Sequence, residues 1–149
     1  LFLYLYGDNV EEAMGKIWYL AFYLSCGLLA AFAQALSNPD SPIPMVGASG
    51  AISGVIAGYL LLYPRANVRV FYWLIILLGT IRVPAYLVLG WWLGQQLIAF
   101  PESMNLAGGV AVAAHLGGFA AGFILTPFAK KKGVKLFQSG QTRPFSRNS

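Results

Sequence analysis

Long apolar blocks separated by short polar connectors set the main constraint on how this chain can fold. Of its 149 residues, 58% are hydrophobic and only 10% are charged. A soluble domain carries about 25% charged residues, so most of this surface cannot face water. Glycine is frequent, with 17 residues, and it lets membrane helices approach each other closely. The composition therefore predicts an all-α, polytopic membrane helix bundle.

Four apolar stretches are interpreted as membrane-spanning helices. They cover residues 15–36, 49–63, 84–99 and 108–128. Prolines and charged residues separate them, and proline is a strong helix breaker. Residues 70–100 are too long for one span and too short for two. We therefore interpret residues 68–80 as an interfacial or re-entrant segment that precedes the third span.

The two ends of the chain fall outside this pattern. Residues 1–7 are too few to cross about 30 Å of hydrocarbon at about 1.5 Å per residue. We interpret them as the last turns of a helix that begins before residue 1, so the chain is expected to be N-terminally truncated. Residues 129–149 form a basic polar tail, which we expect to be disordered. The expected organisation is one membrane domain at residues 1–128, followed by this tail.

The stretch at residues 49–63 is short for a membrane span. A helix of this length covers roughly 22 Å, which is less than a hydrocarbon core of about 30 Å. If its Pro64 end reaches one interface, its Ser49 end lies below the other. Non-helical backbone at that depth is tolerated only against protein or a water-filled cavity. The length therefore predicts a sunken, hydrated pocket at Ser49.

The basic residues all fall on one side of the predicted topology. With the tail in the cytoplasm, the cytoplasmic side receives all 10 lysines and arginines, and the opposite connectors at 37–48 and 100–107 contain none. This distribution follows the positive-inside rule and fits a bacterial inner membrane. It places Ser49 and His115 toward the non-cytoplasmic face. The tail lysines are expected to contact anionic lipids of the bilayer, and the charges form no patch suited to nucleic acid.

His115 is the only histidine of the sequence, and it lies within an apolar run. An ionisable side chain in a membrane is costly, so His115 is a candidate functional residue. The alternative is a histidine that forms a structural hydrogen bond between helices. Ser49 taken alone is better explained as a small residue that permits helix contact. The case for a site depends on the two residues together.

Glycines predict that these two side chains come together. They are Gly50, Gly54 and Gly58 after Ser49, and Gly118 and Gly122 after His115. Their spacing places them on one face of each helix, and two such faces can approach to near contact. His115 would then reach Ser49. An imidazole at that position can take the hydroxyl proton during nucleophilic attack and return it to the leaving amine.

No third member of a catalytic triad is predicted. Asp8, Asp40 and the three glutamates lie outside the helix cores, which favours a Ser–His dyad over a Ser–His–Asp triad. Ser49 begins its helix, where free N–H groups and the positive end of the helix dipole favour a developing oxyanion. The backbone N–H groups of Gly47 and Ser49 are the predicted donors. No metal or cofactor is expected.

At these residues the chain resembles the rhomboid family of intramembrane serine proteases. The shared patterns are Gly47-Ala48-Ser49-Gly50, a GxSG motif that opens a short buried helix, and Ala114-His115 followed by Gly118 and Gly122. Residues 6–11 look like the family's second-helix exit, and residues 82–85 look like a segment of its bacterial members. The resemblance covers about residues 1–128.

The resemblance implies a six-helix core, of which this chain would hold the end of the second helix through the sixth. It implies hydrolysis of peptide bonds in or near transmembrane segments of membrane proteins, by Ser49 and His115, without metal or cofactor. Family members also place His and Asn side chains of the second helix in the oxyanion hole, at positions that would precede Leu1. Some carry a tyrosine four residues after the serine that stacks on the histidine; that position here is Ser53.

Two other functions are compatible with part of this pattern. A catalytically inactive rhomboid-like protein would bind membrane clients without cutting them, but such relatives usually lose the serine or the histidine, and both are present. A small transporter or channel would use His115 as a proton relay and would need further polar residues along a path through the membrane. The apolar blocks offer only Gln34, Gln95 and Gln96, which lie near helix ends.

Overall fold

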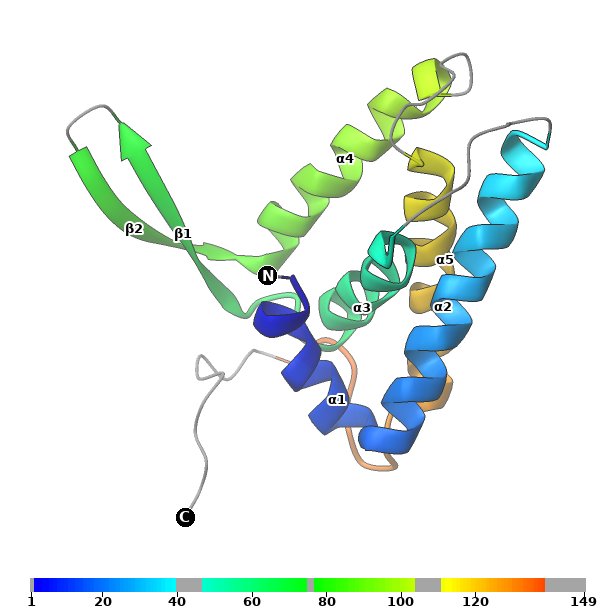
Figure 1. The fold of residues 1–149 in the computed structure, drawn as a ribbon. Coiled ribbons are helices and arrows are strands. Elements are labelled where there is room, and N and C mark those ends of the chain that lie inside the picture. Colours follow the sequence, from blue (N-terminus) through cyan, green and yellow to red (C-terminus); the bar gives the residue numbers. More distant parts are fainter. Residues whose placement is uncertain (1, 40–46, 75–76, 104–110, 139–149) are drawn as a thin grey trace.

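A computed structural model describes residues 2–39, 47–74, 77–103 and 111–138 of the chain, and most of them are helical. The elements are, in order, the π-helix η1 (Leu3–Gly7), α1 (Asp8–Met14), α2 (Lys16–Ser37), α3 (Ser49–Leu62), β1 (Asn67–Leu74), β2 (Leu77–Pro84), α4 (Ala85–Ser103) and α5 (Val112–Ala129). Helices α2, α3 and α5 form the centre of the bundle, and α4 lies against α5 (Figure 1). The mostly helical architecture is consistent with the helical fold that was predicted, while the crossing of a membrane by several of these helices stays a prediction.

Small residues make the contacts between the central helices. A Cβ added to Gly117 of α5 would collide with Ala33 of α2. A Cβ on Gly54 of α3 would collide with Cys26 of α2. Because neither position has room for a side chain, the backbones of the three helices approach one another closely, as they do in membrane bundles.

An outward-facing apolar stripe runs along α2. Its members are Ile17, Leu20, Leu24, Leu28, Phe32 and Leu36, and all are exposed, Ile17 by 84%. Their spacing of three or four residues places them on one helix face. A continuous apolar surface of this kind is unfavourable in water and is typical of a helix that faces lipid. Among the described helices, α2 and α5 are long and apolar enough to cross a membrane.

Residues 67–84 depart from the predicted all-α fold. They form an antiparallel hairpin, β1 paired with β2, in which Asn67 lies opposite Pro84 and Leu74 opposite Leu77. Figure 1 shows the hairpin projecting to one side of the bundle. The segment is rich in β-branched and aromatic residues, which fit a pleated strand better than a helix. The segment at residues 68–80, expected to be interfacial or re-entrant, is therefore part of a pair of strands, and its position relative to the membrane stays a prediction.

The segment after α5 also differs from expectation, because residues 130–138 pack back on the bundle. The backbone N–H of Lys131 donates to the Ala13 carbonyl of α1, at 2.9 Å. The N–H groups of Phe137 and Gln138 donate to the carbonyls of Leu61 and Leu62, both at 2.8 Å. The last carbonyls of a helix have no partner within the helix, so these bonds satisfy the end of α3. The rest of the tail that was expected to be disordered, residues 139–149, lies outside the described residues.

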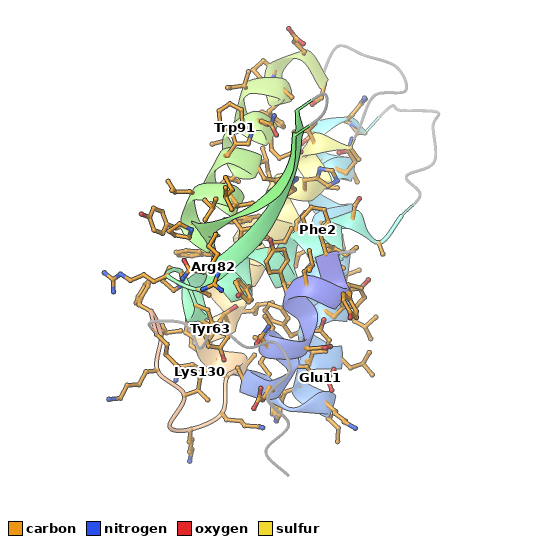
Figure 2. The ribbon with its side chains drawn as sticks, turned by 90° about the vertical axis from the view of Figure 1, so that its left-hand side faces the viewer. Phe2, Glu11, Tyr63, Arg82, Trp91 and Lys130 are labelled. Atoms are coloured by element: carbon orange, nitrogen blue, oxygen red, sulfur yellow. The ribbon has the colours of Figure 1, made fainter. Side chains whose placement is uncertain are left out.

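The basic ends of the helices gather at one end of the molecule. Lys16 begins α2, and Lys130 directly follows α5. The bond from Lys131 to Ala13 ties these two ends together. Figure 2 shows Lys130 and Glu11 at this end and Trp91 of α4 toward the other. In Figure 1 the first turns of α3 and α5, which hold the candidate site residues, lie farther up the bundle than the start of α2 and the end of α5.

Candidate active site

Ser49 is the first residue of α3, and its side chain is exposed. Gly47, two residues earlier, has a φ of 126°, a backbone conformation that favours glycine. The chain then enters the helix through Ala48, which makes no side-chain capping hydrogen bond. The first-turn N–H groups of a helix have no acceptor within the helix. The N–H groups at the start of α3 are therefore potential donors close to Ser49.

Helices α3 and α5 run in the same direction and touch through glycines. A Cβ on Gly118 would overlap the Gly50 carbonyl, and a Cβ on Gly122 would overlap the Gly54 carbonyl. A Cβ on Gly50 would lie 3.3 Å from the Ala114 carbonyl oxygen. Residue 50 thus lies at the level of residues 114–118. Ser49 and His115 are consequently at the same level of two helices in backbone contact.

The His115 ring is held by two residues of α4. Its Nδ1 lies 2.7 Å from Oε1 of Gln96, in hydrogen-bonding range. The ring centroid of Trp92, one turn earlier on α4, lies 6.0 Å from that of His115. The ring is therefore fixed by a hydrogen bond at one nitrogen and by an aromatic neighbour.

Gln34 of α2 anchors the start of the helix that carries His115. Its Oε1 accepts a hydrogen bond from the backbone N–H of Ala114, at 3.2 Å. Ala114 is in the first turn of α5, where a backbone N–H has no partner within the helix. Gln34 supplies that partner from a neighbouring helix and so fixes the residue next to His115.

No hydrogen bond joins the Ser49 hydroxyl to the His115 ring in the part of the chain that the structure describes. The hydroxyl of Ser53 donates to the Ser49 carbonyl, at 2.8 Å, and is itself buried. In enzymes without substrate, catalytic hydrogen bonds are often long and shorten only in the reacting complex. The geometry sets the two residues at the same level of adjacent helices, with no hydrogen bond between them.

The site contains three polar or aromatic residues that sequence reasoning did not assign to it. These are Gln34, Trp92 and Gln96. The two glutamines could have been identified from the sequence, because an amide side chain in an apolar helix is costly unless it has a hydrogen-bond partner. Trp92 carried no comparable signal, because an aromatic residue is ordinary in an apolar helix. Within residues 2–39, 47–74, 77–103 and 111–138, no cluster of three potential metal ligands was found.

A helical bundle with an outward apolar stripe and polar side chains gathered at the start of two glycine-packed helices is a membrane-embedded helical protein. A family model described as Rhomboid domain matches residues 1–132. The chain therefore belongs to the rhomboid family. Searches of curated proteins and of solved structures gave no match.

Proposed function

We propose that this protein is an intramembrane serine endopeptidase in which Ser49 is the nucleophile and His115 the general base and acid. The observation that carries the proposal is the contact of α3 and α5 through Gly50 and Gly118, which sets Ser49 and His115 at one level. Membership of the rhomboid family supports the same reaction, because the family consists mainly of serine proteases.

In the proposed reaction, Ser49 Oγ attacks the carbonyl carbon of a substrate peptide bond as His115 takes the hydroxyl proton. The carbonyl oxygen gains negative charge, which the backbone N–H groups of Gly47 and Ser49 stabilise. When the C–N bond breaks, His115 returns the proton to the leaving amine. A water molecule, deprotonated by His115, then hydrolyses the ester on Ser49 and restores the free hydroxyl.

The substrates we propose are transmembrane segments of other membrane proteins. Helix α3 has 14 residues, which at about 1.5 Å per residue is short of a hydrocarbon core of about 30 Å. Ser49 would therefore act below the membrane surface. The lysines at the opposite end of the bundle favour a cytoplasmic C-terminus and an active site toward the non-cytoplasmic face.

An activity-based probe tests the nucleophile directly. A fluorophosphonate should label the full-length protein in membranes, and Ser49→Ala should abolish the labelling. Ser25→Ala is a matched control, because Ser25 is an exposed serine of α2 and its loss should leave labelling intact. Labelling that persists in Ser49→Ala would contradict the assignment.

A second candidate function is a catalytically inactive rhomboid-like protein that binds membrane clients. The observation that favours it is the missing hydrogen bond between Ser49 and His115 in the described residues. Cleavage of a model single-span substrate separates the two functions. The protease should release a fragment that His115→Asn does not release, whereas a binding protein should retain the substrate intact.

A further inference from the structure

Gln96 makes the one hydrogen bond recorded for the His115 ring among the described residues, at 2.7 Å from Nδ1. The bonding atom of Gln96 is Oε1, a carbonyl oxygen that only accepts. With the amide in this orientation Nδ1 carries the proton, whereas the reversed amide would present its NH₂ group to Nδ1. A neutral imidazole has one N–H, so Nε2 is left with its lone pair. This is the tautomer that a base acting through Nε2 requires.

We propose that Gln96 is a positioning residue that fixes the tautomer and ring orientation of His115. The inference rests on the proposed function, since a tautomer matters to catalysis only if His115 is the base. In serine proteases with a triad, a carboxylate performs this task. Among the described residues no carboxylate bonds to the His115 ring, and an amide oxygen provides the acceptor without placing a second charge in the membrane.

The packing of α4 explains why Gln96 can act in this way. Ala85 and Leu89 are fully buried, and Trp92 is partly buried against the core. Positions 85, 89, 92 and 96 recur every three or four residues, so they share one helix face. That face is turned toward α5, so Gln96 lies next to the His115 ring. The neighbouring residues Trp91, 72% exposed, and Gln95 lie on the outer side.

Trp92 completes the arrangement from a second direction. Its ring lies 6.0 Å from that of His115 and 6.4 Å from that of Phe119, one turn further along α5. An aromatic face near an imidazole favours the cation that forms when the base takes a proton. Together the amide and the indole restrict the rotation of the His115 ring, whereas Gln96 alone determines which nitrogen bears the proton.

The tautomer can be measured without any assay of activity. His115 is the only histidine in these 149 residues. The full-length protein is labelled with ¹⁵N-histidine, and the signal that disappears in His115→Asn is assigned to the His115 ring. The expected spectrum at a pH where the ring is neutral shows a protonated Nδ1 and an unprotonated Nε2. In Gln96→Leu both tautomers should be populated and should interconvert. A spectrum with an unprotonated Nδ1 in the wild type would overturn the proposal.

Cleavage kinetics supply the second measurement. Gln96→Leu should lower kcat by about 10–100-fold, the effect seen when a metal-ligating histidine loses the partner that orients it, with little change in KM. Gln96→Glu keeps an acceptor oxygen and should recover most of that loss. Gln95→Leu makes the same change at an exposed neighbour and should be neutral. Equal kcat in Gln96→Leu and Gln95→Leu, or no recovery in Gln96→Glu, would overturn the proposal.

Probe labelling of Ser49→Ala and the ¹⁵N spectrum together separate this inference from the proposed function. If Ser49→Ala retains probe labelling, the protease assignment fails, while the ¹⁵N spectrum still shows whether Gln96 sets the tautomer. If Ser49 is the nucleophile but the spectrum shows the opposite tautomer, only the role of Gln96 fails.

Discussion

Gly118 of α5 lies directly against the carbonyl group of Gly50 of α3, and no side chain fits between them. The next glycine along each helix repeats the contact, with Gly122 against Gly54. Because glycine has no Cβ, the two backbones come closer than any other residue pair would allow. This contact determines how far His115 can be from Ser49, since each is within three residues of the glycine pair.

Replacing Gly118 by alanine should separate the two helices. The added Cβ would overlap the Gly50 backbone, which cannot move as a flexible side chain can. Overpacking of this kind costs about 1–3 kcal/mol of folding free energy. We expect a lower unfolding midpoint in detergent and a loss of probe labelling at Ser49.

Gly94→Ala is the matched control for this change. An added Cβ at Gly94 of α4 meets no atom within 4 Å, and alanine favours a helix interior over glycine by about 0.5–1 kcal/mol. This variant should be as stable as the wild type or more stable. Equal unfolding midpoints for Gly118→Ala and Gly94→Ala would show that the backbone contact is unimportant.

The helices and the candidate residues could be predicted from the sequence because each is marked by a local sequence pattern. Apolar runs and prolines gave helix positions that agree with α2, α3, α4 and α5 to within a few residues. His115 stood out because an ionisable side chain is rare in an apolar run, and Ser49 because glycine faces on the two helices predicted that it lies near His115. Their catalytic role stays a prediction, as do the oxyanion donors.

The hairpin and the contacts of α4 could not be predicted from the sequence in this way. Hydropathy reports how apolar residues 67–84 are, and an apolar segment of that length suits either a strand or a helix. The contact of Gln96 with His115 depends on how α4 is rotated about its axis. That rotation is set by the burial of Ala85 and Leu89, which are ordinary apolar residues in the sequence.

Alanine at Gly47 should lower catalysis by disturbing the entry into α3. The φ of 126° is strained for any residue with a Cβ, at a cost of about 1–3 kcal/mol. The backbone would relax and move the N–H groups proposed for the oxyanion. Loss of one such donor lowers kcat by about 10²–10³-fold, which steady-state cleavage of a model substrate would measure.

Gly133→Ala separates backbone strain from catalysis. Gly133 has a φ of 98° and open space around an added Cβ, and it lies in the segment after α5, at the opposite end from Ser49. The strain should be similar in the two variants, and kcat should fall only in Gly47→Ala. A similar fall in both would assign the effect to stability alone.

Replacing Gln34 by leucine should loosen the start of α5. The substitution removes the acceptor for the Ala114 N–H, and Ala114 is buried. A buried donor left without a partner costs about 1–3 kcal/mol. Hydrogen exchange at the first turn of α5 should become faster, with the exposed Gln95→Leu variant as reference. Unchanged exchange at Ala114 would mean that Gln34 is not its partner in the membrane.

Truncation of the C-terminal segment tests whether residues 133–138 support α3. A chain ending at Gln138 keeps the bonds from Phe137 and Gln138 to the Leu61 and Leu62 carbonyls, whereas a chain ending at Lys132 loses both. A hydrogen bond contributes about 0.5–1.5 kcal/mol net, so the shorter chain should be less stable by about 1–3 kcal/mol. Unfolding in detergent would measure the difference. If the two truncated chains unfold at the same midpoint, these bonds do not stabilise the helix, and the last turn of α3 must be satisfied by water instead.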